Sequence, residues 1–223
     1  MIVCSLGYGY VAKYVLKELS SIGVLGLGVS SKKEIFDNSN ENFIPFHRDD
    51  SAKAIKISTD ILITAPSYDK GCPVFKNYSY VISNSNIKEI TYISTTGVYG
   101  NHNGSWVDEK STLKAKHAKD RNRIRAENQW IKFTKIHNIK LNILRVASIY
   151  GPAKIKTFNG KTKIIIKKNE HFFSRIHIYD LARAISKIML KGYDNGIWNL
   201  ADNLPSTRDE FLLEVVRIKK IKK

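Results

Sequence analysis

The chain has 223 residues, 43% hydrophobic and 26% charged, which is typical of a soluble globular protein and excludes a disordered chain. No apolar run approaches the roughly 20 residues that a membrane helix needs, and Cys4 and Cys72 are too few for a disulfide framework. The formal net charge is +17. The apolar start Met1–Leu6 has no basic residue before it, so we expect a first strand rather than a secretion signal, and a cytoplasmic protein.

The excess of basic over acidic side chains lies entirely in the second half of the chain. Residues 1–109 carry 10 basic and 11 acidic side chains, whereas residues 110–223 carry 27 and 9. There are 28 lysines against 9 arginines, although phosphate and base readout usually rely on arginine. The balance favours a solvated lysine-rich surface first, an anionic substrate or cofactor second, and nucleic acid last.

Strand and helix patterns alternate along the first two thirds of the chain. Apolar runs predict strands, and apolar residues at helical spacing predict helices. In chain order they are a strand at Ile2–Leu6, a helix at Val11–Ile22, a strand at Val24–Val29, a weaker strand near Phe43–Phe46, a weaker helix near Ser51–Ile57, a strand at Asp60–Thr64, a helix at Val74–Ile82, a strand at Glu89–Ser94, a helix at Lys119–His137 and a strand at Lys140–Arg145.

This alternation predicts an α/β fold of the Rossmann type, with a doubly wound parallel sheet over residues 1–150. Ligands of such folds bind beyond the carboxyl ends of the strands. The segments to inspect are residues 7–12, 30–33, 65–71, 94–100 and 146–152. They contribute these candidate cofactor contacts outside the glycine loop: Ala65, Pro66, Ser94 and Ala147.

The pattern changes after Gly151. We expect residues 151–223 to form a small substrate lobe that covers the cofactor site. Its predicted elements are a strand at Lys163–Ile166, a helix at Tyr179–Lys191, a strand at Ile197–Leu200 and a helix at Thr207–Val216.

A dinucleotide-binding loop follows the first strand. In the pattern Gly7-x-Gly9-x-x-Ala12, Gly7 permits the tight turn and Gly9 lets a pyrophosphate approach the backbone at the helix N-terminus. Ala12 lets the helix pack closely on the strand, and Tyr10 and Val11 open that helix. The strand–loop–helix context is what makes this pattern specific. The sequence therefore predicts that the protein binds NAD or NADP.

The end of the second strand favours NADP. Sites selective for NAD usually carry a carboxylate about 20 residues after the loop, which binds the ribose 2′-hydroxyl. Here the residues are Ser30, Ser31, Lys32 and Lys33, and the first carboxylate comes at Glu34. Hydroxyl and ammonium groups suit a 2′-phosphate better. We therefore expect NADP(H) to be preferred, with NAD(H) as the alternative.

Four further motifs carry a family resemblance. They are Ile93–Gly100 with Val98-Tyr99-Gly100 at its end, Leu144–Pro152, Arg175–Ala182 and Trp198–Ala201. Together with the glycine loop they resemble the extended short-chain dehydrogenases/reductases known as NAD-dependent epimerases and dehydratases. The resemblance runs from residue 2 to about residue 210. The family is usually longer at its C-terminus, so we expect a truncated substrate lobe.

The resemblance implies catalytic positions. In the family a Ser or Thr orients the substrate oxygen, a Tyr is the acid/base for hydride transfer, and a Lys lowers the Tyr pKa. The match places the hydroxyl role on Thr95. Aligning Glu127 with the family's glutamate puts Lys119 at the Tyr position and Arg123 at the Lys position. The chain therefore resembles the atypical members of the superfamily, which lack this pair.

These replacements alter the chemistry. Arg123 is able to bind the ribose and pyrophosphate but does not readily exchange a proton. Lys119 can act as an acid/base only where burial or neighbouring cations assist it. Tyr99 and His117 are alternative candidates for the acid/base, each ranked below a structural interpretation.

Other candidate residues have simpler interpretations. His177 is expected to be a structural histidine whose ring is hydrogen-bonded within the protein. Asp180 is expected to be the N-cap of its helix or an acidic residue in the first turn of that helix. No Cys/His cluster has the spacing of a metal site.

Three functions remain open. The first is an NAD(P)-dependent oxidoreductase or epimerase that acts on a small polar or nucleotide-linked, anionic molecule. A homodimer is one assembly that we expect for such a protein. The second is a non-catalytic dinucleotide-binding protein, such as a redox sensor or a decayed enzyme, which the missing Tyr-Lys pair favours. RNA binding by the basic half ranks third.

Overall fold

The computed structural model describes residues 1–30, 43–68, 71–152, 171–192 and 195–219. Their core is a seven-stranded parallel sheet with the order β10-β6-β5-β4-β1-β2-β3. The direction of winding reverses between β1 and β4, because β2 and β3 extend the sheet on one side and β5, β6 and β10 on the other. This is the doubly wound α/β architecture that the sequence predicts.

The strands of the sheet and the helices that cover it agree closely with the predicted ranges, whereas the two 3-10 helices and the short strands outside the sheet have no predicted range. From the N-terminus they are β1 (Ile2–Leu6), α1 (Tyr10–Ser20), β2 (Leu25–Ser30), β3 (Ile44–His47), the 3-10 helix η1 (Arg48–Asp50), α3 (Ser51–Lys56), β4 (Asp60–Ile63), α4 (Pro73–Ser83), β5 (Glu89–Thr95), the 3-10 helix η2 (Thr96–Tyr99), α5 (Ala118–His137) and β6 (Lys140–Val146). They continue as β7 (Ser148–Tyr150), β8 (Phe172–Phe173), β9 (Arg175–His177), α6 (Ile178–Lys191), β10 (Gly196–Leu200), β11 (Ser206–Thr207) and α7 (Arg208–Lys219).

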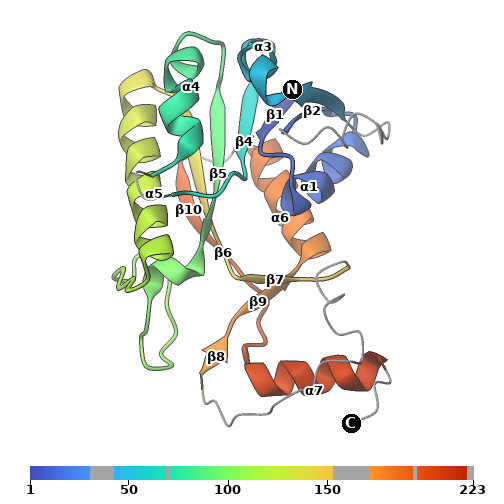
Figure 1. Cartoon of the computed structure of the whole chain (residues 1–223), viewed down its shortest axis with the longest axis vertical. Coiled ribbons are helices and arrows are strands. Elements are labelled where there is room, and N and C mark those ends of the chain that lie inside the picture. Colours follow the sequence, from blue (N-terminus) through green and yellow to red (C-terminus); the bar gives the residue numbers. More distant parts are fainter. Residues whose placement is uncertain (31–42, 69–70, 153–170, 193–194, 220–223) are drawn as a thin grey trace.

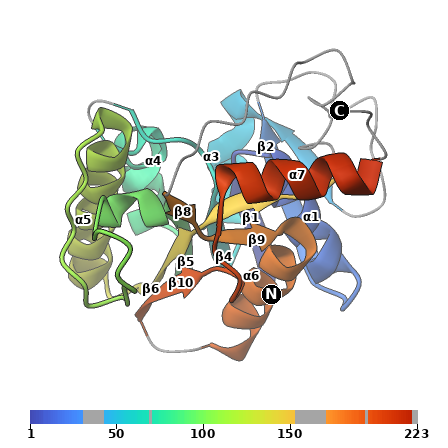
Figure 2. The same ribbon diagram turned by 90° about the horizontal axis from the view of Figure 1, so that it is seen from below.

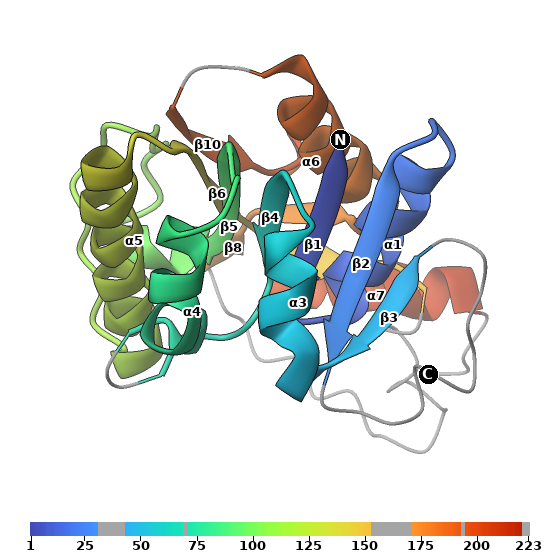
Figure 3. The same ribbon diagram turned by 90° about the horizontal axis from the view of Figure 1, so that it is seen from above.

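Helices cover both faces of the sheet. Figure 3 shows α3, α4 and α5 on one face and α1 and α6 on the other. On the first face Trp130 of α5 is fully buried and meets Phe75 and Phe133 edge-on, at ring distances of 5.2 and 5.6 Å. On the second face Val15, Leu16 and other apolar residues of α1 pack with those of α6. Because both faces are covered, the strands are apolar on both sides, as parallel sheets require.

The sheet extends beyond the expected domain boundary at residue 150. β10 pairs in parallel with β6, with Trp198 opposite Leu144. α6 packs against α1 and helps to close the core on that face. The predicted division at residue 150 therefore does not follow the layers of the structure, because elements from both sides of it share one core. The predicted strand at Lys163–Ile166 lies outside the described residues.

A smaller unit lies at the carboxyl ends of the strands. It contains α7 and the short pairs β7–β9 and β8–β11 (Figure 1). Figure 2 shows α7 crossing this end of the molecule. Arg175 holds the unit together: its Nη1 donates to the Phe173 carbonyl at 3.1 Å and to the Ser206 carbonyl at 3.0 Å. Its guanidinium also lies 4.4 Å from the centre of the Phe211 ring, so one buried cation joins β8, β11 and α7.

None of the described helices is long and apolar enough to cross a membrane.

Two carboxyl groups are buried at the amino ends of β4 and β5. Asp60 and Glu89 are opposite each other in the strand register. Burial raises the pKa of Asp60, and burial together with the neighbouring Asp60 charge raises the pKa of Glu89, although Asn142 donates to Glu89 Oε1 at 2.9 Å and Lys140 is also near. A carboxyl whose pKa is raised by folding stabilises the protein when protonated. That contribution is complete at acidic pH and is lost as the pH rises through the folded pKa.

Replacing Glu89 with Gln should therefore stabilise the protein near neutral pH. The amide oxygen of Gln still accepts from Asn142, but no charge has to be buried. We expect the free energy of unfolding of Glu89→Gln to exceed that of the wild type near neutral pH and to approach it below about pH 4.5, the ordinary value for a glutamate. Urea unfolding at both pH values measures this. A difference that did not change with pH would contradict it.

Candidate functional site

The glycine loop connects β1 to α1 at the carboxyl edge of the sheet. Gly7 has a φ of +105°, a conformation that L side chains rarely adopt, and a Cβ there would lie 2.9 Å from the backbone nitrogen of Ala65. Gly9 is the N-cap of α1, and a Cβ on it would meet nothing within 4 Å. Gly7 thus closes the turn against the end of β4, while Gly9 leaves open space before the N-terminus of α1. Free backbone N–H groups at such a helix end attract anions.

A cavity of about 450 Å³ lies beside this loop. Five of the predicted cofactor residues line it: Gly7, Gly9, Ser30, Ala65 and Pro66. They come from the ends of β1, β2 and β4, which are neighbours in the sheet. The predicted contacts Ser31 and Lys32, with Lys33, lie outside the described residues.

Arg48 also lines this cavity and was not predicted from the sequence. It directly follows β3, whose last residue His47 is opposite Ser30 in the register. The Arg48 carbonyl accepts from Ser51 Oγ at 2.5 Å and from the Tyr78 hydroxyl at 3.3 Å, and these bonds fix the turn. Its side chain is exposed, and its guanidinium has no hydrogen-bond or ion-pair partner among the described residues. The apolar pattern of residues 30–59 is weak, so Arg48 was not selected from the sequence. An arginine directly after a short predicted strand is nevertheless a signal for a residue at the ligand-binding edge of the sheet.

The other side of the loop connects to the segment after β6. Tyr10, the first residue of α1, donates its hydroxyl to the Pro152 carbonyl at 2.6 Å. Its ring lies 5.3 Å from that of Tyr14. Ala12 is fully buried where α1 packs on the sheet, and Val11 is half-buried. Tyr10 is therefore a connection between the glycine loop and the Tyr150-Gly151-Pro152 segment.

Thr95 and Ser94 end β5 with different roles. Thr95 is the half-buried N-cap of η2, and its Oγ1 accepts from the Gly97 backbone nitrogen at 3.1 Å. The Thr95 hydroxyl proton is therefore left for another acceptor. Ser94 is buried, and its Oγ donates to Glu127. Its hydroxyl is thus bonded within the protein, on the face that α5 covers.

Arg123 is fixed against the sheet, whereas Lys119 is exposed. The Arg123 Nη1 donates to the Ile93 carbonyl at 2.9 Å and to the Tyr92 hydroxyl at 3.1 Å, and it lies 3.5 Å from the Ala65 carbonyl. The guanidinium is half-buried at the carboxyl ends of β4 and β5. Lys119, one turn earlier in α5, and the N-cap His117 are both exposed.

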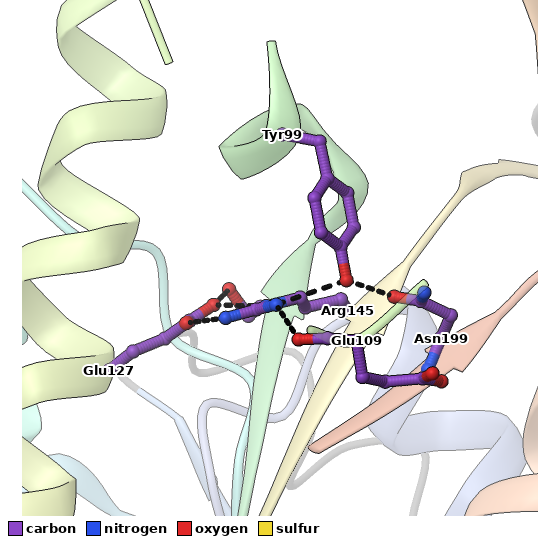
Figure 4. A network of polar contacts seen from close by, with 6 residues as sticks. Tyr99, Glu109, Glu127, Arg145 and Asn199 are labelled. Carbon is purple, nitrogen blue, oxygen red and sulfur yellow. Dashed lines mark hydrogen bonds and ion pairs between the residues drawn. The ribbon is translucent and has the colours of Figure 1, made fainter. Parts of the chain in front are cut away.

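A buried polar network stands beside these residues (Figure 4). Arg145 of β6 forms an ion pair with Glu127 of α5 at 2.9 Å, and its Nη1 donates to the Tyr99 hydroxyl at 3.0 Å. The Tyr99 hydroxyl in turn donates to Asn199 Oδ1 at 2.7 Å. Glu109 closes the network, because its carbonyl accepts from Arg145 and its carboxylate accepts from the Asn199 backbone nitrogen at 2.7 Å. The network joins α5, η2, β6, β10 and the loop before α5.

Three further residues have structural contacts. His177 caps α6, with its Nδ1 accepting from the Tyr179 backbone nitrogen at 3.4 Å, and Asp180 is the acid of the first turn. Both agree with their structural interpretations. Ala147 is buried, and its nitrogen donates to the Leu200 carbonyl at 3.0 Å. Within the described ranges, no group of three His, Cys, Asp or Glu side chains is arranged to hold a metal ion.

Many solved structures share this arrangement. A functionally unknown conserved protein from Silicibacter pomeroyi matches with a TM-score of 0.88 and 27% identity, over 99% of this chain and 79% of its own. A UDP-glucose 4-epimerase from Thermus thermophilus in complex with NAD matches with a TM-score of 0.80 and 15% identity, over 99% of this chain and 84% of its own. A putative NAD-dependent epimerase/dehydratase from Methylobacillus flagellatus matches with a TM-score of 0.78 and 19% identity, over 100% of this chain and 82% of its own. No family model and no curated protein matches the sequence.

The chain has the fold of the NAD-dependent epimerases and dehydratases. The family resemblance of the sequence motifs is thereby confirmed at the level of the fold. Within the epimerase fold, the Val98-Tyr99-Gly100 motif supplies the central hydroxyl of the network in Figure 4. That hydroxyl already donates one hydrogen bond and accepts another, which favours the structural interpretation of Tyr99 over the catalytic one. The motifs at Arg145 and Asn199 are joined through it.

Proposed function

We propose that this protein binds NADP(H) in the cavity beside the glycine loop and acts as an oxidoreductase or epimerase on a small polar or nucleotide-linked, anionic substrate. The observation that carries the proposal is the geometry of Gly7 and Gly9, which leaves the N-terminus of α1 open to a pyrophosphate next to a cavity of about 450 Å³. A protein of the same fold from Thermus thermophilus is a UDP-glucose 4-epimerase that binds NAD, which supports the cofactor class and the substrate class.

The residues of the cavity fit a dinucleotide. The α1 N-terminus would hold the pyrophosphate, and Ser30 and Arg48 would hold the adenosine ribose with its 2′-phosphate. Ala65 and Pro66 would form the wall at the end of β4, and Arg123 would contact the second ribose. When bound, the cofactor supplies a hydride acceptor or donor.

The preference for NADP(H) is tested by the variant Ser30→Asp combined with Arg48→Ala. The new carboxylate repels a 2′-phosphate and can accept a hydrogen bond from a 2′-hydroxyl, and the loss of Arg48 removes a phosphate-binding cation. We expect the ratio of NADPH affinity to NADH affinity to fall by about tenfold, or 1.4 kcal/mol. Fluorescence titration with both cofactors measures this. Tighter binding of NADH by the wild type would refute the preference.

Thr95 is assigned the task of orienting the substrate oxygen. Because its Oγ1 accepts from Gly97, its proton is directed to another acceptor. The Arg123 guanidinium has only N–H donors and is therefore assigned to position the ligand rather than to transfer a proton. Lys119 is the candidate for moving a proton, at its Nζ, once bound substrate covers this exposed side chain.

Loss of the Thr95 hydroxyl should lower turnover by about tenfold, the cost of one hydrogen bond to the reacting oxygen. The assay is a screen of nucleotide sugars and carbonyl substrates with NADPH and NADH, comparing wild type with Thr95→Ala. Thr95→Ser is the matched control, because it keeps the oxygen that accepts from Gly97. Turnover that is unaffected in Thr95→Ala would reject this site.

A non-catalytic dinucleotide-binding protein is the second candidate. The observation that favours it is the arrangement of α5, where Lys119 is exposed and the Arg123 side chain is bonded to the sheet, so neither reproduces a tyrosine–lysine pair. Nucleotide released on denaturing the purified protein, combined with no turnover in the screen, would select this candidate over the enzyme.

The cytoplasmic location and the homodimer stay predictions. Cys4 and Cys72 are both free and buried in the structure. Light scattering of the purified protein measures the assembly.

A further inference from the structure

A groove lies between the C-terminal ends of α1 and α6, on the face of the sheet that these two helices cover. Its volume is about 310 Å³, and it is lined by Glu18 of α1, by Ile22 in the turn after α1, and by residues of α6 from Arg183 to Lys191. α1 begins at the glycine loop and ends at this groove, so its 11 residues separate the two sites by about 16 Å. The lobe with α7 lies at the other end of the molecule (Figure 1). The groove is therefore not part of the cofactor site.

Two apolar side chains are exposed in the groove. Ile22 and Leu190 line it and are 55% and 43% exposed. Removing such apolar surface from water is favourable, so a ligand that covers the two side chains is stabilised by their burial. Ser186 of α6 also lines the groove, but it is only 3% exposed and its Oγ is buried beneath the surface.

Basic side chains run along the same groove. Arg183, Lys187 and Lys191 lie four residues apart on α6, so they form one stripe, and Glu18 of α1 is the single acid in the lining. The helix dipole favours a cation at Lys191, in the last turn of α6. That effect ends within one turn, so it does not account for Arg183, two turns earlier. The stripe is complementary to an acidic ligand.

We propose that this groove binds an acidic peptide segment of a partner protein. An apolar side chain of the segment lies between Ile22 and Leu190, and its carboxylates pair with Arg183 and Lys187. The groove is at the lower end of the 300 to 1,000 Å³ range of small-molecule sites. It therefore accommodates one anchoring side chain rather than a whole cofactor. The guanidinium of Arg183 matches a carboxylate with two parallel hydrogen bonds.

The test is selection from a random peptide library displayed on phage, with the full-length protein as bait. We expect enriched peptides to carry an apolar residue flanked by Asp or Glu. The affinity of an enriched peptide, measured by fluorescence anisotropy, should fall at least about tenfold in Arg183→Glu, which converts an attraction into a repulsion.

Lys132→Glu is the matched control. Lys132 is exposed on α5, on the opposite face of the sheet, and the variant has the same change in net charge. It should bind the peptide like the wild type. Circular dichroism checks that both variants are folded.

Three results would overturn the proposal. The enriched peptides could lack acidic residues, the Arg183→Glu and Lys132→Glu variants could bind equally, or Arg183→Glu could weaken the binding of a single-stranded RNA and not that of the peptide. The last result would assign the stripe to phosphates, and the affinity would then fall steeply with salt.

Discussion

Gly9→Asp should abolish dinucleotide binding while the protein stays folded. A Cβ at Gly9 meets nothing within 4 Å, so the side chain enters open space and disturbs no packing. Its carboxylate then occupies the position before the α1 N-terminus that the pyrophosphate needs, and it repels that anion. We expect the affinity for NADPH to fall about 1,000-fold, or roughly 4 kcal/mol. Fluorescence titration measures the affinity, and thermal unfolding without cofactor measures the stability.

Two variants of the same loop make the result specific. Gly9→Ala adds a methyl group to the same open space, so the fold should be unaffected. Gly7→Ala should instead lower stability, because its φ of +105° is strained for alanine and its Cβ would lie 2.9 Å from the Ala65 nitrogen. NADPH binding to Gly9→Asp at wild-type affinity would show that the pyrophosphate does not lie at this helix end.

Local patterns in the sequence were sufficient to predict the residue ranges of the sheet's strands and of the helices between them. The strand predicted at Asp60–Thr64 is β4, Asp60–Ile63, and the helix predicted at Lys119–His137 is α5, Ala118–His137. Such ranges are predictable because a strand buried on both faces is a continuous apolar run, and a helix over a sheet keeps its apolar period. The same rules place the glycine loop at the carboxyl edge, and hence the cavity beside it.

Contacts between distant segments were not predictable in this way. Arg145 and Glu127 are 18 residues apart, and their ion pair depends on how α5 packs on β6. Periodicity predicts a strand at Ile197–Leu200 but not that it pairs with β6 at the edge of the sheet. Arg48 depends likewise on β3 pairing beside β2. Each requires the tertiary arrangement, which a local pattern does not contain.

Helix α5 shows that helical spacing alone does not predict which side chains are buried. Lys119 and Arg123 are four residues apart, and the helical repeat predicts that both face the cofactor. Arg123 does lie against the carboxyl ends of β4 and β5, but Lys119 stands in the first turn, where its side chain is exposed. Spacing determines the direction of a side chain, whereas the elements around it determine what covers it.

Removing the Glu127 carboxylate should destabilise the protein more than any surface change. Its ion pair with Arg145 is 2.9 Å long, and the two side chains are 2% and 4% exposed. Glu127→Ala leaves the guanidinium buried without its counter-ion and removes the acceptor of the Ser94 hydroxyl. Breaking one partner of a buried pair costs about 3–5 kcal/mol. The free energy of unfolding in urea should fall by that amount.

Two comparisons separate the buried charge from the other effects. The double variant Glu127→Leu with Arg145→Met removes both charges and fills the space with apolar groups, so it should be more stable than Glu127→Ala. Glu214→Ala breaks the exposed pair between Glu214 and Arg217 on α7 and should leave the unfolding curve unchanged. If the double variant were no more stable than Glu127→Ala, the loss would come from the cavity and not from the unpaired charge of Arg145. The network of Figure 4 would then contribute packing, and its charges would contribute little to the stability of the fold.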